Sequence, residues 1–185
     1  MAIRIIAGQF KGRKIQVPDV QGLRPTPDRV RTTLFNWLQQ SIYGLNCLDA
    51  FAGSGVLGLE AISRGAQQVT ALESDRVAAS AVNHLLEAWQ VGPNYQMIQA
   101  NTLQWLTKCE QTFELIFLDP PFESQALNEA VAIILQRQLL TANGLIYIED
   151  SKSKPGFAGH PLLESIKNTA AGDVTARLYK ICMID

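Results

Sequence analysis

The sequence predicts an α/β protein whose sheet is mostly parallel and covered by helices on both faces. Three observations support this fold class. Short apolar runs alternate with stretches of helical periodicity from residue 45 onward, which is typical of parallel sheets with crossover helices. A glycine-rich turn joins the first of these runs to a helical stretch. The 185 residues are 47% hydrophobic and 18% charged, which suits one domain with a sizeable core.

The elements of the α/β body follow from periodicity and turn residues. Strands are expected where a short apolar run is bounded by turn residues. These runs are residues 45–50, 68–73, 95–100, 115–118, 145–149 and 175–184. Helices are expected where apolar side chains recur every three to four residues. These stretches are residues 56–64, 76–89, 103–108, 125–138 and a short piece near 162–167.

The first 44 residues have a different pattern, and we expect them to form an appendage to a body of residues 45–185. Two short β-type runs, 3–6 and 14–17, flank a turn-rich connection, which predicts a small hairpin. Apolar side chains then recur at helical spacing over residues 28–41. Thr26 or Asp28 is the candidate N-cap of this helix.

Charge is distributed unevenly along the chain, although the net charge is only −1. Residues 1–31 carry seven basic and two acidic side chains, a net charge of +5. The remaining residues carry nine basic and fifteen acidic side chains, a net charge of −6. A basic segment on an acidic body suggests that one end binds a polyanion. A solvated basic hairpin would explain the same charges, and charge alone leaves both interpretations open.

Several classes of protein are disfavoured by what the chain lacks. No apolar run reaches the roughly 18 residues that a membrane-spanning helix needs, and the first residues lack the basic and apolar regions of a signal peptide. Cys47, Cys109 and Cys182 are far apart and do not form metal-ligand pairs. We therefore expect a cytoplasmic monomer with reduced thiols, no metal site and no membrane segment.

The most informative stretch runs from a strand through a glycine turn into a helix, at residues 48–58. Gly53, Gly55 and Gly58 match the G-x-G-x-x-G pattern of dinucleotide-binding folds, which alone is weak evidence. Asp49 places a carboxylate at the end of the strand, where ligands of α/β sheets bind. That carboxylate suits a cationic group such as the amino group of a methionine moiety, and it is badly placed for a pyrophosphate. The turn therefore favours S-adenosylmethionine over a nicotinamide cofactor.

Two residues farther along are candidates for the nucleoside part of the cofactor. Glu73 ends the next strand, about 20 residues after the glycines, where an acid accepts hydrogen bonds from ribose hydroxyls. This position fits NAD and S-adenosylmethionine equally. Asn101 follows the third strand and is a candidate for the adenine edge, but a helix N-cap explains it equally well.

A second motif, Asp119-Pro120-Pro121-Phe122, follows a buried strand. An exocyclic amine on a base is a poor nucleophile, because its lone pair is delocalised into the ring. A carboxylate at Asp119 and the carbonyl of Pro120 can each accept one N–H, which orients the lone pair. The prolines stiffen the turn. Phe122 offers a flat face to a flipped base, and such stacking contributes about 1–3 kcal/mol.

Together, the glycine turn and this second motif resemble those of class I methyltransferases that act on base amines. The whole chain is most similar to the RsmD-like guanine-N2 methyltransferases of bacterial small-subunit (16S) ribosomal RNA. The resemblance spans nearly all 185 residues, and its N-terminal part is the most specific. It is carried by residues 4–8, 12–13, 23–26, 29–31, 34–36, 49–58, 60–61, 63–66 and 119–122.

This resemblance implies a Rossmann-like class I methyltransferase fold with a seven-stranded sheet, a reversed final hairpin and a β-hairpin arm for RNA. It implies methyl transfer from S-adenosylmethionine to guanine N2 in ribosomal RNA or the small ribosomal subunit. The implied residues fall into three groups. The cofactor-binding group is Asp49, Gly53, Gly55, Glu73, Asn101 and Thr26, the catalytic group is Asp119, Pro120 and Phe122, and the RNA-binding group is Arg4, Lys11, Arg13, Arg24 and Arg29.

Three other functions remain to be distinguished from this one. DNA adenine-N6 methylation uses the same second motif, but it usually needs a separate target-recognition domain, for which 185 residues leave little room. A nicotinamide oxidoreductase would leave the second motif unexplained. A non-catalytic RNA-binding assembly factor would have no need of the Asp119 carboxylate.

Overall fold

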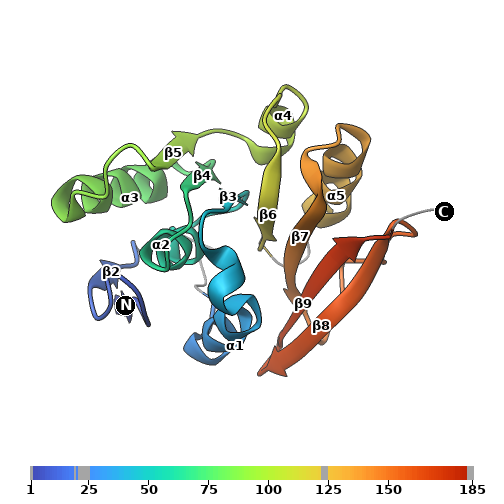
Figure 1. Cartoon of the computed structure of the whole chain (residues 1–185), viewed down its shortest axis with the longest axis horizontal. Coiled ribbons are helices and arrows are strands. Elements are labelled where there is room, and N and C mark those ends of the chain that lie inside the picture. The colour runs from blue at the N-terminus through green and yellow to red at the C-terminus, as the bar shows by residue number, and fades with distance from the viewer. Residues whose placement is uncertain (1, 19, 21–25, 122–124, 183–185) are drawn as a thin grey trace.

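The structure is a computed structural model that describes residues 2–18, 20, 26–121 and 125–182. Its centre is a seven-stranded sheet in the order β5-β4-β3-β6-β7-β9-β8 (Figure 1). The strands from β5 to β7 run parallel, and β9 is antiparallel to both β7 and β8. The bounds are β3 (Asn46–Asp49), β4 (Gln68–Glu73), β5 (Tyr95–Gln99), β6 (Phe113–Leu118), β7 (Leu140–Ser151), β8 (Leu163–Ala171) and β9 (Val174–Ile181).

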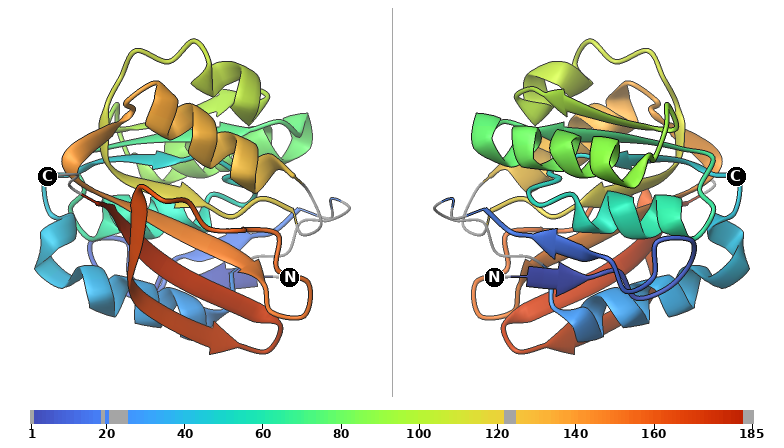
Figure 2. Two further views of the ribbon diagram at one scale, coloured as in Figure 1. Left: turned by 90° about the vertical axis from the view of Figure 1, so that its right-hand side faces the viewer. Right: turned by 90° about the vertical axis from the view of Figure 1, so that its left-hand side faces the viewer.

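Helices cover both faces of this sheet, as the alternation of elements predicts. One face carries α1 (Asp28–Leu38), α2 (Val56–Ser63) and α3 (Arg76–Trp89), and the other carries α4 (Thr102–Leu106) and α5 (Ala126–Gln136). Figure 2 shows α1 and α5 on opposite sides of the sheet. A hydrophobic core lies on each face of the sheet, and consecutive strand residues pack into opposite cores. Cys47 packs on the α2 face and Leu48 on the α5 face. The strands are therefore buried on both sides, which explains their nearly continuous apolar runs.

One expected element is wrong. The segment near 162–167 is not a helix but the beginning of the edge strand β8. Leu162, Leu163 and Ile166 have helical spacing, but this segment pairs with β9 along its length, with a shift in register between Ser165 and Lys167. Tertiary pairing overrides local periodicity here. The reversed final hairpin implied by the resemblance is present as β8–β9.

The N-terminal hairpin consists of β1 (Ala2–Arg4) and β2 (Lys14–Gln16), which pair antiparallel. It is tied to α2 by a buried carboxylate: Glu60 accepts hydrogen bonds from the backbone N–H of Ile6 (2.9 Å) and Ala7 (3.1 Å). Arg64 pairs with the same carboxylate at 2.8 Å. Ile3, Ile5 and Ile15 join the core on the α2 face. The hairpin is thus packed on the body, although the expected boundary near residue 44 stays a prediction.

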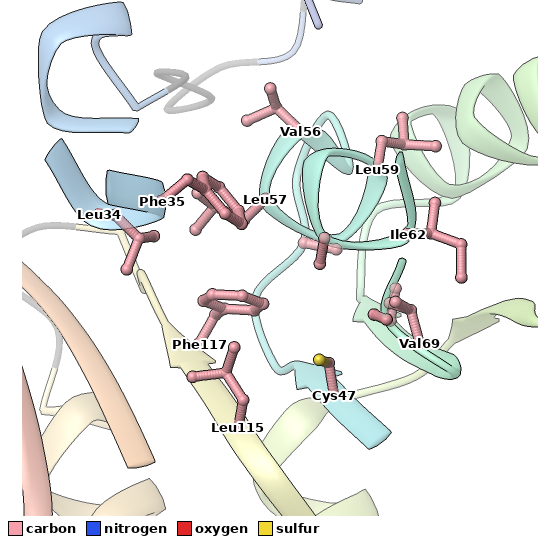
Figure 3. Packing of buried hydrophobic residues seen from close by; sticks show 14 of the residues in the cluster. Leu34, Phe35, Cys47, Val56, Leu57, Leu59, Ile62, Val69, Leu115 and Phe117 are labelled. Carbon is pink, nitrogen blue, oxygen red and sulfur yellow. The ribbon is translucent and has the colours of Figure 1, made fainter. Parts of the chain in front are cut away.

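Helix α1 connects this N-terminal segment to the sheet. Figure 3 shows Phe35 of α1 lying between Leu57 of α2 and Phe117 of β6. The rings of Phe35 and Phe117 are 6.2 Å apart between centroids. A short 3₁₀ helix, η1 (Gln39–Ile42), extends α1, so the expected helix over 28–41 is present in two parts.

The expected cap of α1 is wrong. Its N-cap is Pro27, which makes no side-chain capping bond. Asp28 lies in the first helical turn, where its carboxylate accepts from Arg31 Nη2 at 2.6 Å. The hydroxyl of Thr26 points elsewhere and donates to Asp119 at 3.2 Å. Both candidate caps are therefore engaged in other interactions.

Candidate active site

A cavity of about 670 Å³ opens at the carboxyl ends of the parallel strands, a volume in the range of small-molecule sites. Its walls come from the glycine turn after β3, the ends of β4, β6 and β7, the turn between β8 and β9, and the segment before α1. The polar residues that line it include Thr26, Asp49, Ser54, Glu73, Asp75, Thr102, Asp119, Glu149 and Asp173.

The glycine turn adopts a conformation that favours glycine. Gly53 and Gly55 have φ values of +52° and +73°, in the left-handed region. Gly55 is the N-cap of α2. A Cβ on Gly58 would lie 2.7 Å from the Tyr95 hydroxyl and 3.0 Å from Val69, so this glycine allows α2 to pack closely on the sheet. The first two glycines shape the cavity wall, and the third sets the distance between helix and strand.

Glu73 fixes the turn from the neighbouring strand. Its Oε2 accepts from the backbone N–H of Gly53 at 2.8 Å, and its Oε1 accepts from the N–H of Asp75 at 2.7 Å. An ionised carboxylate has about four acceptor sites, so Glu73 keeps acceptor capacity toward the cavity. This matches the role expected for it, to accept hydrogen bonds from ribose hydroxyls.

Asp49 is buried behind the turn and accepts from the backbone N–H of Gly58 at 3.0 Å. Burial, with the charges of Asp119 and Glu73, raises the pKa of Asp49 to about 7, although the Gly58 hydrogen bond opposes the rise. Because burial disfavours the ionised form of this carboxyl group, a cation beside it would stabilise that form. The cavity therefore favours a positively charged ligand.

Asp119 lies across the cavity from the glycine turn, at the end of β6, and is partly exposed to the cavity. Its Oδ2 accepts the Thr26 hydroxyl, and this contact joins residues 93 positions apart in sequence. Desolvation and the charge of Glu149 raise the pKa of Asp119 well above its usual range, and the Thr26 hydrogen bond opposes them. Pro120 is buried beside it and also lines the cavity.

Glu149, on β7, is a further carboxylate at this edge and is 2% exposed. The Tyr147 hydroxyl donates to its Oε1 at 2.8 Å. Burial, with the charge of Asp49, raises the pKa of Glu149 to about 7, although hydrogen bonds from Thr26 and Tyr147 and the charge of Arg31 lower it. The cavity thus contains several acidic side chains, among them Asp49, Asp119 and Glu149, which strengthens its preference for a cation.

The structure brings together most of the residues predicted for cofactor and base. Thr26, Asp49, Gly53, Glu73, Asp119 and Pro120 line the cavity, and Gly55 closes the turn behind it. The Asn101 side chain caps α4 by accepting from the N–H of Gln104 at 3.1 Å; the next residue, Thr102, lines the cavity. Phe122 and Arg24 lie outside the described residues.

The predicted RNA-binding residues lie away from the cavity walls. Arg4, Lys11 and Arg13 are exposed on the hairpin, and Arg29 is exposed on α1. Arg13 lies 5.0 Å from the ring centroid of Phe10 and 5.5 Å from that of Trp89, so part of its role is structural.

The lining residues missed in the sequence include Glu149 and Thr102. Glu149 had a usable signal, because it follows the apolar run of 145–148 just as Asp49 and Asp119 follow theirs. Thr102 had none, because its hydroxyl contributes through a hydrogen bond to the carbonyl of Ala50, 52 residues away.

The described residues also bear on metal binding and on membrane insertion. Among those residues, no group of three or more His, Cys, Asp or Glu side chains is arranged to hold a metal ion. No helix in this part of the chain is long and apolar enough to cross a membrane. The three cysteines are free, with Cys47 and Cys109 buried.

Comparison with known proteins gives a family. The family described as "Conserved hypothetical protein 95" matches residues 3–180. "Ribosomal RNA small subunit methyltransferase D" of Escherichia coli (strain K12) is 42% identical over 179 residues, covering 96% of this chain and 89% of the relative. The protein of the same name from Haemophilus influenzae is 40% identical over 181 residues, covering 96% and 93%.

Solved structures agree with this family. The "putative methyltransferase yhhF" of Escherichia coli superposes with a TM-score of 0.88 at 38% identity, covering 98% of both chains. The Podospora anserina methyltransferase PaMTH1, solved with bound SAH, shares the fold with a TM-score of 0.66 at 15% identity and covers 85% of this chain. With its parallel sheet and reversed hairpin, the chain has the Rossmann-like class I methyltransferase fold, and it belongs to the "Conserved hypothetical protein 95" family, the RsmD-like methyltransferases.

Proposed function

We propose that this protein transfers a methyl group from S-adenosylmethionine to the exocyclic N2 amine of a guanine in small-subunit ribosomal RNA. The observation that carries the proposal is the placement of Asp119 and Pro120 in one cavity with Asp49 and Glu73. One half of that cavity suits a cationic nucleoside, and the other half suits an amine. The relatives named as ribosomal RNA small subunit methyltransferases support the substrate class.

The residues of the glycine turn fit S-adenosylmethionine. When bound, this cofactor supplies a methyl group on a positively charged sulfur. Asp49 offers the charge of opposite sign, and Glu73 offers acceptors for ribose hydroxyls. A neutral or anionic ligand would leave the buried carboxylates without compensation, which is costly in a low-dielectric site.

Asp119 and Pro120 act on the nucleophile. The Thr26 hydroxyl occupies Asp119 Oδ2, which leaves Oδ1 to accept one N–H of the target amine, while the Pro120 carbonyl accepts the other. These two bonds localise the nitrogen lone pair and hold it toward the methyl carbon. Forming the new N–C bond would break the bond between the methyl carbon and the cofactor sulfur, which would keep the electron pair as a neutral thioether; the amine would become more acidic, and the ionised Asp119 Oδ1 would take the released proton. The raised pKa of Asp119 favours that acceptance.

The hairpin supplies the RNA contact in this proposal. Its basic side chains are exposed, and phosphates release counterions when they meet such residues. The hairpin is fixed to α2 by Glu60 and Ser63. RNA bound there would therefore be held at a defined position relative to the cavity.

The test uses radiolabelled S-adenosylmethionine and substrates from a strain that lacks the gene. The protein is incubated with small ribosomal subunits, total RNA and duplex DNA, and the modified nucleoside is identified by mass after digestion. The expected product is N2-methylguanosine from small-subunit RNA, with none from the Asp119→Ala variant. N6-methyladenine in DNA would overturn the substrate. Tight cofactor binding without transfer to any substrate, together with full function of Asp119→Ala in cells, would favour an assembly factor.

A further inference from the structure

The cavity contains a pair of carboxylates of which the proposed transfer uses only one. Leu118 of β6 pairs with Ile148 of β7 in parallel register, so Asp119 and Glu149 occupy the next positions on neighbouring strands. Both line the cavity. The Thr26 hydroxyl donates to Asp119 at 3.2 Å, and the same hydroxyl lowers the pKa of Glu149. Both carboxyl groups therefore lie near the Thr26 hydroxyl.

Glu149 is held more rigidly than a solvent-facing acid would be. It is 2% exposed, and Tyr147, itself fully buried, donates to its Oε1. The Arg31 guanidinium, 0% exposed, favours the ionised form of Glu149. A cationic cofactor in the same cavity would favour that form further. Glu149 is therefore a fixed hydrogen-bond acceptor beside Asp119, the group proposed to hold the target amine.

The amine-bearing bases differ in what lies next to the amine. On its Watson–Crick edge, guanine presents an N–H donor, N1–H, beside its N2 amine. Adenine and cytosine present an acceptor nitrogen beside their amines. A carboxylate facing that position accepts a hydrogen bond from guanine but repels the lone pair of the other two bases. One carboxylate can thus favour the binding of guanine and disfavour that of adenine and cytosine.

We propose that Glu149 is a specificity-determining residue that selects guanine by accepting the hydrogen bond of its N1–H while Asp119 holds the N2 amine. The inference rests on the proposed function and adds a structural basis for its choice of base. It also gives a use to a buried acid that the transfer itself does not need. The Tyr147 hydroxyl then acts as a positioning group that aims the carboxylate.

The test compares guanine with 2-aminopurine, which keeps the N2 amine but has an acceptor at N1. After the methylated nucleotide is mapped, each base is placed at that position by ligation of a synthetic segment into the ribosomal RNA, which is assembled into subunits. The two substrates compete for one enzyme, and the ratio of products is measured. Because a general loss of activity affects both substrates equally, the ratio reports on base selection alone.

Wild type should prefer guanine by about 10- to 100-fold, the range expected for one hydrogen bond to a charged group. Glu149→Gln keeps the size and the Tyr147 contact but can donate to an acceptor, so the preference should fall to near one or reverse. Tyr147→Phe should reduce the preference while leaving the cavity lining intact. The control is Glu164→Gln on β8, an exposed acid paired with Lys180, which should leave the ratio unchanged.

The outcomes separate the two proposals. If wild type does not methylate guanine in subunits or RNA, the proposed function fails. If wild type methylates guanine but accepts 2-aminopurine equally well, or if Glu149→Gln keeps the wild-type ratio, only the role of Glu149 fails. Should Glu149→Gln not fold, as judged by its melting curve, the Tyr147→Phe ratio decides, and an unchanged value there overturns the inference.

Discussion

Asp49 should make cofactor binding depend on pH. Its pKa is about 7, so the carboxylate is about one-tenth ionised at pH 6 and half ionised at pH 7. The sulfonium of S-adenosylmethionine is permanently charged, and an α-amino group stays mostly protonated over this range. Only ionised Asp49 compensates that positive charge. The affinity should therefore rise with pH, in step with the ionised fraction.

The magnitude follows from the two ionised fractions. Their ratio predicts an affinity about fivefold higher at pH 7 than at pH 6, or about 1 kcal/mol. Glu149 titrates in the same cavity with a pKa of about 7, and its ionisation would steepen the dependence. Asp49→Asn keeps an oxygen that can accept from the Gly58 N–H but cannot ionise. This variant should bind more weakly at pH 7 and show a shallower slope.

Titration calorimetry at constant ionic strength measures this dependence directly. Repeating it in buffers with different ionisation enthalpies detects the proton released on binding, which should approach half a proton or more per cofactor at pH 7. Glu164→Gln is the matched control, since this acid is exposed and pairs with Lys180. An affinity that is flat from pH 6 to pH 7, or an equal slope in Asp49→Asn, would refute the electrostatic reasoning.

Three further changes test the packing and the hairpin. Gly58→Ala places a methyl group 2.7 Å from the Tyr95 hydroxyl and should cost about 1–3 kcal/mol in urea unfolding; Tyr95→Phe should restore part of it, since that hydroxyl has no partner among the described residues. Glu60→Ala breaks a buried pair and should cost about 3–5 kcal/mol, with faster proteolysis of the hairpin; a cost below about 1 kcal/mol would contradict its anchoring role. Neutralising the hairpin cations should lower the salt slope of RNA binding by about 2–3, while unchanged affinity and slope would exclude the hairpin as an RNA contact. These cations are Arg4, Lys11 and Arg13.

The sequence predicted the parallel part of the sheet well, for a physical reason. A strand buried on both faces must be apolar at nearly every position, and residues 115–118 show this directly. The edge strand β8 has no such constraint, because five consecutive residues of it, 164–168, are exposed. Its sequence therefore carried a misleading helical spacing. Only its pairing with β9, a contact between distant residues, determines its conformation.

The site residues likewise divide into those that a local sequence pattern predicts and those that it does not. The acids at strand ends, Asp49 and Asp119, were predictable because ligands meet parallel sheets at that edge. Glu149 was missed although it ends the expected strand 145–149; the observed β7 continues to Ser151. The hydrogen bond between Thr26 and Asp119 spans 93 residues and is set by the tertiary structure. A local sequence pattern does not reveal a contact between such distant residues.

The N-terminal segment also takes part in the site. Thr26 donates a hydrogen bond to Asp119, the carboxylate proposed to hold the target amine, and the charge of Arg31 helps to lower the pKa of Glu149. Arg31 Nη2 also donates to the carbonyl of Arg4, the last residue of β1, at 3.2 Å. The hairpin proposed to bind RNA is thus joined by a hydrogen bond to Arg31, whose charge acts on Glu149 in the proposed base site. Choosing one nucleotide in a long RNA requires such rigidity, because a shift of about 1 Å at the reacting atoms costs about a hundredfold in rate.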